Sequence, residues 1–273
     1  MRTLSLVVIL MLASSLCLGA HKDPKPGKLK RKLPNRLKQL KKEKYDGMAT
    51  SPKDFGLSGN NKLDAPFSSR LRVSVSPNSP HFARQPAVVD EKEFQPYIIA
   101  PTFDGGWFIF SRFNPGRGHD YTGTQYLVRR FTETFEEKFK ILLNGHLLYR
   151  NTEVQDARLH NGKVYYNEAC GSYSSGYKGK CSHLACLDPV AGEVVWRTPD
   201  LVSNNIFIFK DDDTIIAGYG FTDEPDHLFL INAADGKVLS RTRLDSAHTY
   251  LEMKEGKLHV FTYKSHYVFG FRK

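Results

Sequence analysis

Short runs of alternating hydrophobic and polar residues dominate the chain from about residue 95 to its end. Each run is rich in Val, Ile, Leu, Phe and Tyr, and most runs end at Asn-Gly, Asp-Gly or a similar turn sequence. Such segments are typical of β-strands joined by tight hairpins. No part of this region shows the 3.6-residue hydrophobic period of an amphipathic helix, so the pattern predicts an all-β fold.

The predicted strands recur in groups of four. The segment 154–197 reads strand, turn, strand, long loop, strand, turn, strand, and the segment 205–240 repeats this order. A looser copy covers 97–142, and 249–272 supplies three more strands. Four-stranded units that repeat at this spacing are typical of β-propeller blades, so we expect a β-propeller.

One unit carries a more specific pattern. Residues 183–196 read HLACLDPVAGEVVW, with small and acidic residues before a turn glycine and a Trp at the end of the following strand. This pattern resembles the repeat of pyrroloquinoline-quinone-type propellers, with Ala185, Leu187, Asp188, Gly192 and Trp196 at the matching positions. The next copy keeps the turn as Gly236 but has Ser240 where the Trp would stand. The resemblance covers about two blades and implies a scaffold that unrelated functions share.

The strand count predicts four blades within residues 67–273. Three units have four strands, whereas the last unit has only three. We expect the isolated alternating segment 70–76 to supply the missing strand beside residues 267–272, which would close the ring between the chain ends and remove an open edge. The alternative is a partial or half propeller that pairs with another chain.

The first twenty residues have the pattern of a secretory signal. A basic start is followed by an apolar run over 6–13 and by small residues over 14–20. This run is too short to span a membrane as a mature helix. Lipid attachment at Cys17 is the alternative, but the bulky Leu16 precedes it. We therefore predict a secreted or periplasmic protein, in a compartment where disulfides persist.

Nearly all the net charge lies in residues 21–44. This segment holds eleven Lys and Arg against two acids, a net +9 of the formal +10 of the chain, whereas residues 45–273 are neutral. We expect a disordered basic arm here, followed by a Gly-, Pro- and Ser-rich linker over 45–66. The expected function of the arm is to contact lipid head groups, acidic polysaccharide or nucleic acid, and the alternative is a solvated linker. The predicted contact residues are Lys28, Lys30, Arg31, Lys32, Arg36, Lys38, Lys41 and Lys42.

Long connections between the second and third strands of each unit form the other candidate binding region. They cover 113–124, 171–180 and 221–226, and the repeat places them on one face of the scaffold. Loops on a rigid scaffold commonly carry binding residues. The candidates are Arg112, Arg117, His119, Asp120, Tyr121, Tyr173, Tyr177, Asp223, Glu224 and Asp226.

The cysteines are few and unevenly placed. Cys170 and Cys181 stand at the two ends of the middle loop, so we predict a disulfide that staples its base. Cys186 lies inside a predicted strand and is expected to be a small buried core residue. The spacing of the cysteines does not fit a zinc site.

No catalytic motif is recognisable in the chain. Gly-x-Ser-x-Gly, His-Glu-x-x-His and phosphate-binding glycine loops are all missing from the sequence. We interpret the protein as a non-enzymatic binding module without a cofactor or metal, with a possible protein partner on the loop face. The repeat resemblance implies a quinone-dependent dehydrogenase as an alternative, although those enzymes have more blades. A structural envelope or coat protein is the third possibility.

Overall fold

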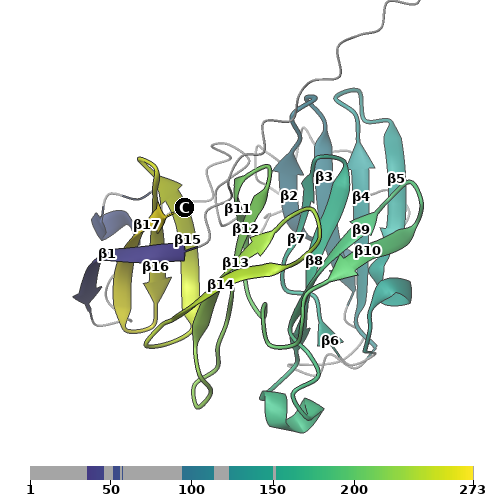
Figure 1. Cartoon of the computed structure of the whole chain (residues 1–273). Coiled ribbons are helices and arrows are strands. Elements are labelled where there is room, and N and C mark those ends of the chain that lie inside the picture. The colour runs from purple at the N-terminus through teal and green to yellow at the C-terminus, as the bar shows by residue number, and fades with distance from the viewer. Residues whose placement is uncertain are drawn as a thin grey trace, which may run out of the picture. The chain divides into compact units, whose positions relative to one another are not determined.

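The computed structural model describes residues 36–45, 52–55, 57, 94–113, 123–149 and 152–272 (Figure 1). All of them fall in one compact unit of the chain, Leu33–Lys273. The predicted signal over 1–20 and the predicted strand over 70–76 lie outside these ranges. The described residues form antiparallel sheets with a few short 3-10 turns, so the all-β prediction is confirmed.

The strands form four antiparallel sheets, which we number as blades 1 to 4 (Figure 1). Blade 1 contains β2 (Gln95–Pro101), β3 (Trp107–Phe113), β4 (Gln125–Phe131) and β5 (Glu137–Leu142). Blade 2 contains β6 (Thr152–Glu153), β7 (Ala157–His160), β8 (Lys163–Cys170), β9 (His183–Asp188) and β10 (Glu193–Arg197). Blade 3 contains β11 (Ile208–Asp211), β12 (Thr214–Tyr219), β13 (His227–Asn232) and β14 (Val238–Arg243). Blade 4 contains β15 (His248–Lys254), β16 (Lys257–Thr262), β17 (Ser265–Arg272) and β1 (Arg36–Lys44).

Three apolar clusters lie between consecutive blades, because side chains on each strand alternate between the two faces of its sheet. The first cluster joins blades 1 and 2 and includes Phe108, Phe110, Tyr126, Val164, Tyr166 and Leu187. The second joins blades 2 and 3 and includes Tyr165, Leu184, Phe207, Phe209, Ile215 and Ile231. The third joins blades 3 and 4 and includes Ile208, Ile216, Leu230, Val260, Tyr267 and Phe269. Face-to-face packing of successive four-stranded sheets is the architecture of a β-propeller.

Polar side chains tie the innermost parts of blades 2, 3 and 4 together. The Asn167 side-chain amide donates to the carbonyl oxygen of Asn205 at 2.6 Å, and the Asn205 amide donates to the carbonyl oxygen of His248 at 2.8 Å. The backbone N–H of Phe207 donates to Oδ2 of Asp156 at 3.0 Å. Asn167, Asp156 and Phe207 are buried, so their bonds also prevent the cost of an unsatisfied polar group.

The repeat glycine and the repeat Trp meet at the boundary of blades 2 and 3. The Trp196 indole N–H donates to the carbonyl oxygen of Ala233 at 3.2 Å. Gly236 has a φ of +72°, and a Cβ at this position would collide with the Trp196 ring. The turn therefore needs glycine both for its left-handed backbone and for the close approach of the ring.

The fourth strand of blade 4 comes from the basic segment. β1 pairs antiparallel with β17, from Arg36 opposite Arg272 to Lys44 opposite Ser265, with a bulge at Leu40. The expectation that 36–44 is disordered is therefore wrong, and so is the expectation that 70–76 is the strand beside β17. Leu37 packs against the apolar cluster of blades 3 and 4, which gives this charged segment a hydrophobic anchor.

The ring of blades is not closed among the described residues. Buried clusters join blade 1 to 2, 2 to 3 and 3 to 4, whereas none joins blade 4 to blade 1 within the described ranges. β1 therefore completes the sheet of blade 4 without producing a closed ring. The fold is a partial propeller of four blades, which was the alternative form of the prediction.

Replacing Leu37 with Asp tests the role of β1. The substitution places a charge against the apolar cluster, so we expect the free energy of unfolding to fall by about 2 kcal/mol. Lys38→Asp is the matched control, because Lys38 is exposed and its replacement should change stability by less than about 0.5 kcal/mol. Urea denaturation measures both, and equal effects of the two variants would show that β1 is not held by Leu37.

Candidate functional site

Two of the long connections are joined side by side. The carboxylate of Glu224, in the β12–β13 connection, accepts hydrogen bonds from the backbone N–H of Ser174 at 2.7 Å and from the Ser174 hydroxyl at 2.9 Å. Its other oxygen accepts a hydrogen bond from the hydroxyl of Tyr219. Ser174 belongs to the β8–β9 connection of blade 2, so Glu224 fixes the loop of one blade against the loop of the next.

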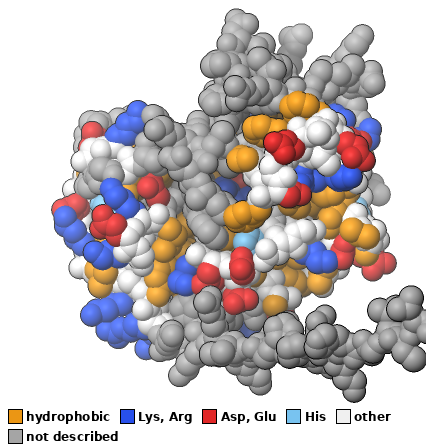
Figure 2. All heavy atoms as spheres, turned by 90° about the horizontal axis from the view of Figure 1, so that it is seen from above, with side chains coloured by type: hydrophobic (Ala, Val, Ile, Leu, Met, Phe, Trp, Pro, Cys, Tyr) orange, Lys and Arg blue, Asp and Glu red, His pale blue; other side chains and the backbone are white. Residues whose placement is uncertain are grey.

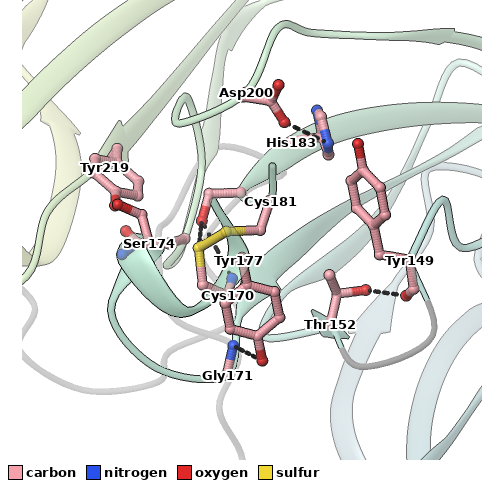
Figure 3. The surroundings of a disulfide bond; sticks show 12 residues. Tyr149, Thr152, Cys170, Gly171, Ser174, Tyr177, Cys181, His183, Asp200 and Tyr219 are labelled. Atoms are coloured by element: carbon pink, nitrogen blue, oxygen red, sulfur yellow. Dashed lines mark hydrogen bonds and ion pairs between the residues drawn. A yellow bond between two sulfur atoms is a disulfide. The ribbon is translucent and has the colours of Figure 1, made fainter. Parts of the chain in front are cut away.

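The disulfide predicted from the sequence closes the base of the β8–β9 connection (Figure 3). Cys170 and Cys181 are bonded, with their Cα atoms 5.2 Å apart, and both are buried. Within this loop the backbone N–H of Gly171 donates to the Tyr177 hydroxyl at 3.0 Å. Cys186, the free cysteine of the described part of the chain, is buried as expected. The loop is therefore held at its base by a covalent bond and within its span by Tyr177.

Aromatic side chains line the joined loops. Tyr173 lies 5.6 Å from Phe221 between ring centroids, and Phe221 lies 6.2 Å from Tyr219. Tyr173 remains 40% exposed, while Phe221 and Tyr177 are partly buried. Tyr and Phe rings that are already held in place offer contact area at a low entropic cost. We call the surface formed by Tyr173, Ser174, Phe221 and Glu224 the joined-loop surface.

Asp226 differs from the other acidic residues predicted in this loop. Asp223 is exposed, whereas Asp226 is 8% exposed and its Oδ1 has no hydrogen-bond partner. Burial and the nearby charge of Asp245 raise the pKa of the Asp226 carboxyl to about 6. Asp226 therefore does not present its carboxylate to a partner as the sequence suggested, because its side chain is turned inward against Gly220.

Asp245 anchors the basic strand to the connection between blades 3 and 4. Its carboxylate lies 3.0 Å from the Lys42 ammonium and accepts hydrogen bonds from Thr262 at 2.9 Å and Ser265 at 2.5 Å. Burial opposes ionisation of Asp245, but the hydrogen bonds from Ser265, Lys42 and Thr262 outweigh it and lower its pKa to about 2. Lys42 was predicted to contact a polyanion; its ammonium group forms this ion pair within the chain, and its contact with a polyanion stays a prediction.

The other predicted arm residues divide into two groups. Lys28, Lys30, Arg31 and Lys32 lie outside the described residues. Arg36 and Lys38 are exposed on β1, and Lys41 forms an ion pair with Glu43 on the same strand. Elsewhere on the face drawn in Figure 2, basic side chains are interspersed with acidic ones, in agreement with the neutral composition of residues 45–273.

The loop of blade 1 is described only at its two ends. Arg117, His119, Asp120 and Tyr121 lie outside the described residues. Arg112, at the end of β3, lies over the ring of Tyr97 at 4.4 Å and 3.9 Å from a carboxylate oxygen of Glu153. The structure therefore does not bring Arg112 to the joined-loop surface by any described contact, and its predicted role in binding stays a prediction.

Sequence reasoning missed a polar cluster beside the disulfide (Figure 3). His183 lies between the carbonyl oxygen of Thr198 at 3.0 Å and a carboxylate oxygen of Asp200 at 3.1 Å, and the Tyr149 ring is stacked on it at 5.9 Å. Asp200 and Tyr149 lie in connections between blades, which carry no repeat signal. The two described polar contacts of His183 are to a carbonyl oxygen and to a carboxylate. A Ser-His-Asp arrangement would also need a hydroxyl or thiol side chain in contact with the imidazole.

Comparisons with known proteins found distant structural similarities and no sequence relative. No family model matches the chain, and no curated protein sequence matches it. Among solved structures, a luciferin-regenerating enzyme is similar at 8% identity with a TM-score of 0.40, over 66% of this chain and 62% of that one. BamB from Moraxella catarrhalis is similar at 12% identity with a TM-score of 0.28, over 66% of this chain and 70% of that one. The chain thus spans less than two thirds of the luciferin-regenerating enzyme, and likenesses this distant carry no argument about function.

Two further observations concern membranes and metals. The helices among the described residues are single 3-10 turns, and none is long and apolar enough to cross a membrane. Within the same residues, no group of three or more His, Cys, Asp or Glu side chains is arranged to hold a metal ion.

Replacing Asp226 with Asn should stabilise the protein in a pH-dependent way. The pKa of Asp226 is raised in the folded state, so its favourable contribution is complete below about pH 4 and is lost as the pH rises through about 6. Because Asn resembles the neutral acid, we expect the variant to be more stable than the wild type by about 1–3 kcal/mol at pH 7.5 and equal to it near pH 3.5.

Urea denaturation at the two pH values measures this difference. Asp223→Asn is the control, because Asp223 is exposed on the same loop and its replacement should change stability by less than about 0.5 kcal/mol at either pH. A stabilisation by Asp226→Asn that is the same at both pH values would contradict the assignment of an unfavourable buried charge.

Proposed function

We propose that the protein is an exported, non-enzymatic binding module that holds an anionic polymer or surface through its basic N-terminal segment. The observation that carries the proposal is the position of β1, because the last nine residues of the +9 segment are a strand of blade 4. The basic segment is thereby attached to a rigid, otherwise neutral scaffold. A cationic segment fixed in this way binds anions mainly by electrostatic attraction.

Export is part of the proposal. The hydrophobic pattern of residues 1–20 supports a secretory signal, and the buried Cys170–Cys181 disulfide is the kind of bond that forms in oxidising compartments. We also propose that the four-stranded repeat is of the pyrroloquinoline-quinone type. The contact of Trp196 with Gly236 gives the repeat residues a structural purpose at the boundary between blades, which supports a scaffold role for them.

Neutralising the basic segment tests the anionic partner. We expect the full-length variant with Lys28, Lys30, Arg31 and Lys32 changed to Gln to bind heparin or acidic vesicles at least tenfold more weakly than the wild type at low salt. The affinity of the wild type should also fall steeply as salt rises through physiological strength. Equal affinity of the two proteins at low salt would mean that the segment is only a linker.

A second partner at the joined-loop surface is favoured by the Glu224–Ser174 bonds. These bonds fix the β8–β9 connection, which carries the partly exposed Tyr173, against the β12–β13 connection. Tyr173 is therefore held in place before any partner binds. Aromatic residues in such positions commonly dominate protein–protein interfaces. This surface makes a protein partner the second candidate, which would add selectivity to the electrostatic attachment.

Replacing Tyr173 with Ser separates this contact from background binding. We expect a partner captured from the exported compartment by the wild type to be lost at least tenfold with Tyr173→Ser. It should be retained with Tyr263→Ser, because Tyr263 is an exposed Tyr in the β16–β17 turn, outside the joined-loop surface. Quantitative pull-down measures both variants, and retention by both would remove the joined-loop surface as a binding site.

A further inference from the structure

Basic side chains gather on the face of blade 4 that points away from blade 3. Leu37 and Phe271 pack toward blade 3, so their chain neighbours Arg36, Lys38 and Arg272 project from the opposite face. Arg36 stands directly opposite Arg272 in the pairing of β1 with β17. Two basic residues that are far apart in the sequence are thus placed next to each other.

The same face continues on the two other strands of the blade. Leu258 and Met253 pack toward blade 3, so Lys257 and Lys254 project with the β1 and β17 cations. Lys254 pairs directly with Lys257 across β15 and β16. We call the group formed by Arg36, Lys38, Lys254, Lys257 and Arg272 the blade 4 basic surface.

Cations in this arrangement repel one another. Like charges directly opposite each other in a sheet are destabilising, and Arg36 stands directly opposite Arg272. Within the described ranges, Arg36, Lys38, Lys257 and Arg272 have no carboxylate within ion-pair distance. An external anion would relieve this repulsion.

Three acidic residues lie on the same face or at its margin. Glu43 forms an ion pair with Lys41, and Glu252 accepts a hydrogen bond from the Tyr250 hydroxyl. Glu255 is exposed in the turn between β15 and β16. Gly270, which is opposite Lys38, has no side chain, and the Leu40 side chain lies over it.

We propose that the blade 4 basic surface binds a linear sulfated polysaccharide. The inference rests on the proposed function. It adds that side chains on the strands of blade 4 bind the anionic partner, in addition to the N-terminal segment. The cations lie on all four strands, with Arg36 beside Arg272 and Lys254 beside Lys257, so they extend across the blade as a linear polyanion would require. The Tyr and Phe side chains that the four strands place on this face, Tyr250 and Phe261, are buried, so they cannot stack on nucleic-acid bases.

The test removes cations that lie outside the N-terminal segment. Lys257 and Arg272 are exposed and are changed together to Gln in the full-length protein, with heparin as the probe. We expect the dissociation constant to rise about tenfold at low salt and the dependence of affinity on salt to become shallower, because fewer counterions are released. Unchanged thermal unfolding of the variant confirms that the blade is intact.

Arg241→Gln with Arg243→Gln is the matched control, because both residues are exposed on β14 and the variant loses the same charge. We expect its heparin affinity to stay within about twofold of the wild type. An equal loss in the two double variants would overturn the proposal, since binding would then follow net charge alone.

The variant with Lys28, Lys30, Arg31 and Lys32 changed to Gln separates this inference from the proposed function. If that variant loses heparin while the Lys257/Arg272 variant binds normally, the proposed function stands and the folded surface is refuted. If the wild type does not bind heparin at low salt, both are refuted. Tighter binding to acidic vesicles or to single-stranded DNA than to heparin, at equal salt, would overturn the choice of polysaccharide.

Discussion

Blades 2 and 3 are apolar on both faces, and the need to bury both faces is the constraint on which the rest of the structure depends. In blade 3, Ile215 and Ala217 face the cluster shared with blade 2, whereas Ile216 faces the cluster shared with blade 4. A sheet with two apolar faces must be covered on both sides. Successive blades meet this need for one another, and the polar contacts of Asn167 and Asn205 then fix how their inner strands align.

The candidate binding regions follow from that packing. Because blades 2 and 3 are held face to face, the loops that follow β8 and β12 emerge side by side, where Ser174 and Glu224 can join them. Because blade 4 lacks a fourth strand of its own, the basic segment can be part of the fold and yet keep exposed cations. The scaffold therefore sets the position of both regions. The polar and charged side chains of these regions lie outside the apolar clusters between the blades.

Much of the fold was predictable from sequence because blades 1 to 3 are local in the chain. Alternation, hairpin turns and the repeated glycine identified their strands, and the position of the cysteines identified the disulfide. β1 was missed for a physical reason: Leu37 and Leu40 lie at a helical spacing, the segment has no β-branched residue, and the strand that completes its hydrogen bonds lies at the other end of the chain. The strand conformation of such a segment depends on hydrogen bonds to its neighbouring strand more than on its own amino-acid composition.

The site was predictable only in outline. The repeat placed Tyr173 and Glu224 on one face, but the bond between Ser174 and Glu224 joins residues 50 positions apart, and no local pattern reports it. Asp226 looked like a surface residue in the sequence because Asp is usually exposed. Its burial, and the ion pair of Lys42 with Asp245, depend on tertiary contacts that no local pattern reports.

The origin of β1 has a consequence for the order of events during synthesis. Arg36 pairs with Arg272, so β1 cannot find its partner until more than two hundred further residues have been made. Contacts this distant in sequence close slowly, because a large loop must be ordered first. An unpaired strand is exposed to pairing with other chains, and charged side chains such as the lysines and arginines of β1 disfavour such pairing.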